Sequence, residues 1–258
     1  MSSLTHIFQQ FKATEPFSPP SDWLQGRTVY GGLSAALSLH TAMLEAPEEL
    51  PPLMSAHVSF LGPCSASQTF SATHLYEGKS LISMVADTVS EDRHILHMVM
   101  QFARPRVSKI IHDFTRMPDV GGPHIFPTLV LDHNAPPCAQ NFEFRPAGGA
   151  LPFSGAAIPE LIVWARHVDA EGVDATVALI ALADCVPPGV SACFDTPALF
   201  STVSWAFDLP NPSTVGGWFL IRTFSRKAGN GYSLQSLDVW DESGVQVLTG
   251  RQTVAIFI

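Results

Sequence analysis

The stretch that decides the fold is Gly31-Gly32-Leu33-Ser34-Ala35-Ala36-Leu37, which opens an apolar segment reaching about Glu45. Its composition and the spacing of its apolar side chains predict a helix. Four strand-like segments follow it, at residues 57–61, 69–76, 81–89 and 95–103. The first part of the chain is therefore predicted to be one helix followed by an antiparallel run of strands.

The same order of elements occurs a second time toward the C-terminus. A helical stretch is predicted from Pro159 and continues through residues 175–183. In its first part the apolar residues are spaced at a mixture of i, i+3 and i+4 intervals; they are Leu161, Ile162, Trp164, Ala165 and Val168. Strands are predicted at residues 202–209, 218–225, 234–240 and 245–258. A helix and a run of strands, present twice, predict a duplicated unit.

Short sequence matches in the same order favour this duplication. Gly78-Lys79-Ser80-Leu81-Ile82-Ser83 is similar to Gly231-Tyr232-Ser233-Leu234-Gln235-Ser236, and Val58-Ser59-Phe60 is similar to Val203-Ser204-Trp205. Gln101, near the end of the first run of strands, matches Gln252 near the end of the second. Each match is weak alone, but their shared order indicates two related units.

A proline-rich segment separates the two regions. Nine prolines lie between Arg104 and Glu160, together with the pairs Gly121-Gly122 and Gly148-Gly149. Such a composition excludes a long helix or a central strand and predicts a surface connection with short extended pieces, such as residues 128–131. We therefore expect an N-terminal unit at 1–104, a connection at 105–158 and a C-terminal unit at 159–258.

The composition limits the class of protein and its partners. Of the 258 residues, 46% are hydrophobic and 14% are charged, and the formal net charge is −9. These values exclude disorder and argue against binding nucleic acid, which requires clustered basic residues. The charged fraction is low against a typical value of about 25%. Together with strands apolar on both faces, such as residues 218–221, it predicts a homodimer or larger homo-oligomer in which sheets of separate chains meet.

Location and cofactors can also be predicted. The four cysteines form no CxxC pair and are expected to be reduced thiols. No apolar run approaches the roughly 20 residues that cross a bilayer, and residues 1–17 lack the features of a signal peptide, so we expect a cytoplasmic protein without membrane contact. The histidines have no metal-ligand spacing and no nucleotide-binding loop occurs, which predicts neither a metal nor a cofactor.

Five motifs, taken in order, are similar to those of a known family. They are Val29-Tyr30-Gly31-Gly32, His57-Val58-Ser59-Phe60-Leu61-Gly62-Pro63, Leu75-Tyr76-Glu77-Gly78-Lys79-Ser80, Leu182-Ala183-Asp184, and the last strand with Gln252. In these motifs the chain resembles the acyl-CoA thioesterase II-like proteins. The resemblance implies an α+β fold of two fused hotdog units, each a helix wrapped by a curved antiparallel sheet, joined in one continuous sheet. It also implies hydrolysis of an acyl-CoA to free fatty acid and CoA, a reaction of fatty acid metabolism.

The resemblance also implies which residues form the site. The catalytic positions carried over from the family are Asp184, Thr202 and Gln252, and the substrate-binding positions are Gly31, Gly32, Gly78 and Ser80.

Asp184 is the only charged residue between positions 177 and 186. Burial in such a run raises the pKa of a carboxyl group toward that of a useful general base. The alternative is a solvent-facing residue at a helix end before Pro187-Pro188, although the helix dipole disfavours an acid there.

The other site residues have structural alternatives of the same kind. Gln252 lies on the apolar face of its strand and either orients water or only bonds to neighbouring backbone. Thr202 competes with Ser204, because a register change of one residue turns a different hydroxyl inward. Gly31-Gly32 offers N–H groups to a thioester oxygen or a phosphate, or simply forms a tight turn.

Three other classes of function were compared with the thioesterase. A serine hydrolase is disfavoured because the segment after Gly32 lacks the second glycine of a nucleophile elbow. A hotdog dehydratase uses a histidine paired with a carboxylate on its helix, which neither predicted helix offers. A non-catalytic acyl-ligand-binding or assembly module, which would keep the fold and lose the polar trio, remains the main alternative.

Overall fold

The computed structural model describes residues 2–46, 49–211 and 216–257; Ile258, predicted as the end of the last strand, lies outside them. The elements in chain order are α1 (Leu4–Gln10), η1 (Ser21–Trp23), β1 (Leu24–Gln25), β2 (Thr28–Val29), α2 (Gly31–Glu45), β3 (Leu53–Phe60), β4 (Thr69–Glu77), β5 (Leu81–Ser90), β6 (Arg93–Ala103), η2 (Pro123–Ile125), η3 (Pro137–Asn141), β7 (Phe142–Gly149), β8 (Glu160–His167), α3 (Ala175–Ala183), η4 (Gly189–Cys193), β9 (Leu199–Asp208), β10 (Phe219–Gly229), β11 (Tyr232–Asp241) and β12 (Gln246–Phe257).

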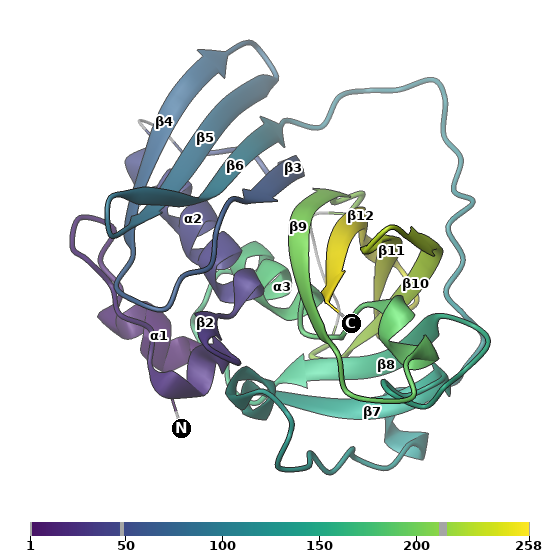
Figure 1. The fold of residues 1–258 in the computed structure, drawn as a ribbon. Coiled ribbons are helices and arrows are strands. Elements are labelled where there is room, and N and C mark those ends of the chain that lie inside the picture. The colour runs from purple at the N-terminus through teal and green to yellow at the C-terminus, as the bar shows by residue number, and fades with distance from the viewer. Residues whose placement is uncertain (1, 47–48, 212–215, 258) are drawn as a thin grey trace.

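One continuous antiparallel sheet organises the protein. Its ten strands follow the order β4-β5-β6-β3-β9-β12-β11-β10-β8-β7, and β1 and β2 form a separate small sheet. The large sheet curves around α2 and α3, which pack against each other (Figure 1). This arrangement confirms the predicted α+β fold of two helix-and-sheet units.

The two units meet where β3 pairs with β9, with Ser59 opposite Ser204. Each side of this line has one helix followed in the chain by four strands, β3 to β6 after α2 and β9 to β12 after α3, which agrees with a duplication; β8 and β7 extend the second side to six strands. One of the sequence matches used to predict it is wrong, however. Gln101 lies opposite Ser83 on the outer face of the sheet, away from the helices, whereas Gln252 is buried on the inner face. Because side chains alternate along a strand, the two glutamines cannot be equivalent.

Both long helices lie within the segments predicted to be helical, although α3 fills only the last part of the second one. Helix α2 spans Gly31–Glu45 and is buried on most sides because it lies between the sheet and α3. Helix α3 spans Ala175–Ala183. Its first turn is capped by Asp174, whose side chain accepts hydrogen bonds from the backbone N–H groups of Thr176 and Val177. No helix in the described ranges is both long enough and apolar enough to span a membrane.

The helix predicted from Pro159 is wrong, because Glu160–His167 forms strand β8. Leu161 and Val163 point into the main core, while Ile162 and Trp164 belong to a second apolar cluster on the outer face. A strand covered on both faces has no alternation of polar and apolar residues, so its sequence cannot be distinguished from a buried helix by periodicity.

The second cluster, here called the outer cluster, consists of Ile162, Trp164, Trp218, Leu220 and Trp240. It is covered by the protein's own proline-rich connection, whose Met117, Val120 and Phe126 pack on it. The Trp164 indole N–H also donates to the Gly121 carbonyl over 3.0 Å. The apolar strand at residues 218–221, from which a contact between chains was predicted, is therefore covered within a single chain.

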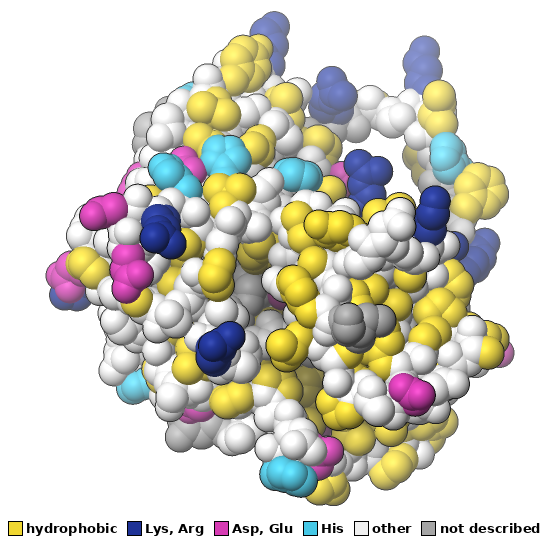
Figure 2. Space-filling view, viewed as in Figure 1, with side chains coloured by type: hydrophobic (Ala, Val, Ile, Leu, Met, Phe, Trp, Pro, Cys, Tyr) yellow, Lys and Arg dark blue, Asp and Glu magenta, His cyan; other side chains and the backbone are white. Residues whose placement is uncertain are grey.

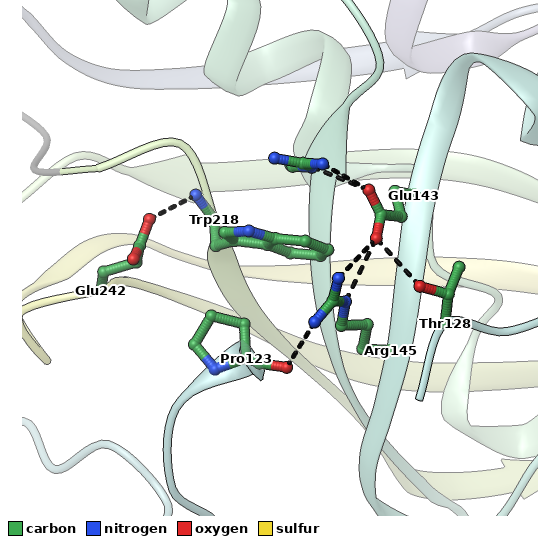
Figure 3. A network of polar contacts seen from close by, with 7 residues as sticks. Pro123, Thr128, Glu143, Arg145, Trp218 and Glu242 are labelled. Carbon is green, nitrogen blue, oxygen red and sulfur yellow. Dashed lines mark hydrogen bonds and ion pairs between the residues drawn. The ribbon is translucent and has the colours of Figure 1, made fainter. Parts of the chain in front are cut away.

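Charged side chains complete this cover (Figure 3). The guanidinium carbons of Arg145 and Arg166 each lie 4.6 Å from the ring centre of Trp218. Glu143 binds both arginines, and Arg145 also donates to the Pro123 carbonyl over 3.1 Å. The ion pairs thus hold the connection against the edge of the sheet.

The rest of the connection has two further parts. From Arg104 it leaves the body as an extended arch, seen at the right of Figure 1, on which Val107 and Ile111 are almost fully exposed. Further on, Phe142–Gly149 forms β7, paired with β8 at the edge of the sheet. Pro146 is compatible with this edge position, where one side of a strand needs no partner.

Candidate active site

The end of α3 brings Asp184 to the inner face of the sheet. Asp184 is the residue that caps the C-terminus of the helix. Its Oδ1 accepts a hydrogen bond of 2.8 Å from the Gln252 side-chain amide on β12. Two residues that lie 68 positions apart, each predicted for the site, therefore form one hydrogen-bonded pair.

The first turn of α2 forms the other side of this pair. The Gly32 backbone N–H donates to the Asp184 carboxylate. A Cβ atom added to Gly31 would lie 3.1 Å from Asp184 Oδ2 and 3.1 Å from the Phe60 ring. The absence of a side chain at Gly31 therefore lets the helix start approach the carboxylate. Figure 2 shows a recess in the surface between the two halves of the sheet.

The surroundings of Asp184 favour a proton on its carboxyl group. Although its side chain keeps some solvent exposure, burial raises the pKa of Asp184 to about 7. The hydrogen bonds from Gln252 and Gly32 act in the opposite direction, because they favour the charged form. The carboxyl group can therefore take up and release a proton near neutral pH, as a general base must.

Two thiols lie near the same carboxylate. Burial raises the pKa of the Cys138 thiol to about 12, and the Asp184 charge adds to this effect. Burial and the same charge raise the pKa of Cys185 well above its ordinary value. Both thiols stay protonated at neutral pH, so neither offers the thiolate needed for nucleophilic attack.

Tyr30, which was not predicted as a site residue, links the two helices beside the site. Its hydroxyl donates to the Ala181 carbonyl in the last turn of α3 over 2.8 Å, and its side chain is buried. A Cβ atom on Gly32 would come within 2.5 Å of this hydroxyl. The motif Tyr30-Gly31-Gly32 contained the signal, since a large ring beside two glycines indicates close packing.

Thr202 and Ser204 lie on opposite faces of β9. Thr202 is paired with Val254, which is buried on the same face as Gln252, whereas Ser204 is paired with the outward Thr253. A bulge at Val203 produces this change of register. The structure therefore places Thr202, and not Ser204, on the face that carries Gln252.

Gly78 and Ser80 are not brought to the same place. They lie in the turn between β4 and β5, where the Gly78 N–H donates to the Leu81 carbonyl and the Ser80 carbonyl accepts from Arg104. Helix α2 begins near Gln68, to which Ser34 is hydrogen-bonded. The turn is ten residues beyond Gln68, about 30 Å along an extended strand. It is therefore remote from Gly31, Gly32 and Asp184 (Figure 1).

One surface cavity is not part of this site. It has a volume of about 580 Å³ and lies on the outer face of the sheet, between His57, Gln101 and Arg251. The sheet itself separates this cavity from the inward-facing Gln252.

Comparisons with known proteins identify the family and agree with the fold. The family model of the acyl-CoA thioesterase N-terminal domain matches residues 19–103, and that of the C-terminal domain matches residues 112–256. No curated protein matches the chain by sequence.

Solved structures show the same fold. A hot dog fold protein of Alicyclobacillus acidocaldarius is 22% identical, with a TM-score of 0.84 over 95% of this chain and 97% of the other. The acyl-CoA thioesterase II TesB2 of Mycobacterium marinum is 20% identical, with a TM-score of 0.72 over 95% and 96%. The tesB protein of Mycobacterium avium subs paratuberculosis is 15% identical, with a TM-score of 0.77 over 98% and 99%. Since the two family models together span most of its length, the chain belongs to the acyl-CoA thioesterase family and is a thioester hydrolase with a double hotdog fold.

Proposed function

We propose that this protein hydrolyses an acyl-CoA to free fatty acid and CoA with a water molecule activated by Asp184. The observation that carries the proposal is the hydrogen bond between Gln252 and an Asp184 carboxyl group whose pKa is raised to about 7. A general base works best when its pKa lies near the operating pH.

In the proposed reaction, ionised Asp184 removes one proton as the water oxygen bonds to the thioester carbonyl carbon. Gln252 orients the carboxylate through its amide N–H, and the Thr202 hydroxyl, on the same face, assists in placing the water. The C–S bond then breaks, and protonated Asp184 returns its proton to the CoA sulfur. Water and thioester are thereby converted into carboxylic acid and thiol without a cofactor.

The carbonyl oxygen becomes negative during the attack and needs hydrogen-bond donors. The start of α2 supplies backbone N–H groups at the positive end of a helix. The N–H of Gly32 is already directed to Asp184. We therefore assign the oxyanion to the neighbouring N–H groups of this first turn, beginning with Gly31.

The direct test is thiol release from a panel of acyl-CoAs with short to long saturated chains. Release from at least one of them is expected. If the purified, folded protein releases thiol from none, the proposal fails and a non-catalytic acyl-ligand-binding module becomes the better description.

We also propose that the protein acts as a homodimer in the cytoplasm. Its four cysteines are free thiols, which suits a reducing compartment. A patch on the outer face of the sheet, here called the outer patch, consists of Leu199, Tyr232, Leu234 and Phe257 on three neighbouring strands. Leu199 is 74% exposed and Phe257 is 61% exposed. Large apolar side chains grouped in this way are typical of a contact between chains.

A further inference from the structure

A row of buried polar side chains extends from Gln252 across the inner face of the sheet. Gln252 is the register partner of Gln235 on β11, and Gln235 is the register partner of Ser225 on β10. Ser233, two residues before Gln235, shares this face. All four side chains are more than 90% buried. The row starts at the residue that binds Asp184 and continues away from it.

The hydrogen bonds within the row leave one of its polar groups unsatisfied. The Ser225 and Ser233 hydroxyl oxygens are 2.7 Å apart, and the Gln235 amide N–H donates to Ser233. The Gln235 Oε1 atom is buried and has no hydrogen-bond partner among the described residues. A buried acceptor without a partner costs about 1–3 kcal/mol, so a native protein keeps one only where something compensates.

A second unsatisfied group lies on the element that covers this part of the sheet. The 3-10 helix η4 packs against β10 and β11. Its Ser191 has a fully buried hydroxyl with no partner among the described residues. Strand β11 and η4 contact each other, and each has one buried polar group, Gln235 Oε1 and the Ser191 hydroxyl, without a partner among the described residues.

We propose that Gln235 binds a hydroxyl group on the acyl chain of the substrate, so that the enzyme prefers hydroxylated acyl-CoAs. This inference rests on the proposed function, which places the thioester carbonyl beside Asp184 and Gln252. A hydroxyl group can donate to the oxygen or accept from the nitrogen of the same amide, so it matches either end of Gln235. A saturated chain in the same position would leave the Gln235 acceptor unsatisfied.

The register indicates where the hydroxyl lies on the acyl chain. Directly opposed residues of neighbouring antiparallel strands are separated by about 5 Å. With carbon–carbon bonds of about 1.5 Å, this distance corresponds to roughly three to five carbons from the thioester carbonyl. Acyl groups with a hydroxyl at C3, C4 or C5 are therefore the substrates to compare.

The test measures binding separately from turnover. Thioether analogues of acyl-CoA, which cannot be hydrolysed, are prepared in pairs of equal chain length with and without a hydroxyl at C3, C4 or C5. Calorimetry should give at least one pair in which the hydroxylated analogue binds about tenfold more tightly or better, the value of one hydrogen bond to a buried group. The kcat/KM values of the corresponding thioesters should differ in the same direction.

Two variants show whether Gln235 causes the preference. Gln235→Met keeps a side chain of similar size but removes both polar atoms, so the ratio of the two Kd values should fall to about one. Gln101→Met changes a glutamine on the outer face and should leave the ratio unchanged. If Gln235→Met does not fold, Ser225→Ala provides a milder change in the same row and should reduce the ratio.

The outcomes separate this inference from the proposed function. Equal affinities within every pair, or a preference that survives in Gln235→Met, would overturn the hydroxyl site even if thiol release is fast. A preference in Kd that Gln235→Met abolishes would support the site even if no thioester is hydrolysed; in that case only the proposed hydrolysis would be overturned.

Discussion

The Asp184 carboxylate lies between the start of α2 and the last strand, and its negative charge is what the proposed reaction uses. Asp184→Asn keeps the size and hydrogen-bonding reach of the side chain but removes the base. We expect kcat/KM to fall about 100- to 10,000-fold while the protein remains folded. Circular dichroism provides the control for folding, and full activity in the folded variant would refute the role of Asp184.

Gln252 should act together with Asp184. Gln252→Ala removes the amide that donates to the carboxylate and leaves a small void on the inner face. We expect this variant to lower kcat/KM by less than Asp184→Asn does. Because residues that act as a unit give non-additive losses, the double variant should be scarcely worse than Asp184→Asn alone. Initial-rate measurements compare the three variants. If the fold-loss of the double variant equals the product of the two single losses, the two side chains act separately.

The pH dependence follows from the raised pKa of Asp184. The base is active when ionised, so kcat/KM should fall about tenfold per pH unit below 7 and level off above it. Gln252→Ala removes a hydrogen bond that lowers this pKa, so the midpoint should move to higher pH. A profile that is flat between pH 5 and pH 9 would be inconsistent with this assignment.

The raised pKa of Asp184 also affects the stability of the fold. Its effect is opposite to that of the usual carboxylate, whose pKa is lowered by folding. The folded-state pKa of Asp184 lies above its unfolded value, so the unfolded protein releases this proton first and stability falls as pH rises from about 4 to about 7. Asp184→Asn should therefore raise the free energy of unfolding at pH 8, by about 1–3 kcal/mol after allowance for partial exposure. Thermal melts of the parent protein and of Asp184→Asn at pH 5 and pH 8 measure this difference in stability.

Thr202 and Ser204 offer a matched pair of hydroxyl deletions on one strand. Thr202 shares the inner face with Gln252, and Ser204 faces outward. We expect Thr202→Ala to lower kcat/KM by about tenfold, less than the loss of the general base. Ser204→Ala should leave it unchanged. A larger effect from Ser204→Ala would mean that the bulge at Val203 does not set the register of the site.

Helix α2 depends on the small size of Gly32 for its contact with α3. A methyl group there would displace the Tyr30 ring and break the bond from its hydroxyl to Ala181. We expect Gly32→Ala to reduce the free energy of unfolding by about 1–3 kcal/mol, as overpacking does. Gly62→Ala, with no atom within 4 Å of the added carbon, is the control and should have little effect in denaturant titrations. Equal effects of the two changes would contradict the role of Tyr30.

The whole molecule is expected to dimerise through the outer patch. Light scattering at micromolar concentration should give twice the mass of one chain. Leu199→Asp places a charge in the patch and should yield a monomer, whereas Leu44→Asp, at a similarly exposed position near the end of α2, should not. A monomeric parent protein at this concentration would refute the proposed contact.

The sequence alone determined those helices and strands whose periodicity is visible within their own segment. The apolar segments of α2 and α3 and the alternating residues of β5 could be read from their own neighbours, because helix and strand periodicity is set within a few residues. Asp184 and Gln252 could be singled out because a charge and an amide interrupt apolar runs, and the resemblance then placed both in one site.

The tertiary structure decided what depends on contacts between distant segments. Segment Glu160–His167 became a strand because the core covers one face and the connection covers the other, which erases the alternation that marks most strands. The face of Thr202 depends on the bulge at Val203, and the row from Gln252 to Ser225 exists only through the register of three strands. Strand register joins residues far apart in the chain, and a shift of one position reverses every side chain, so local sequence cannot determine it.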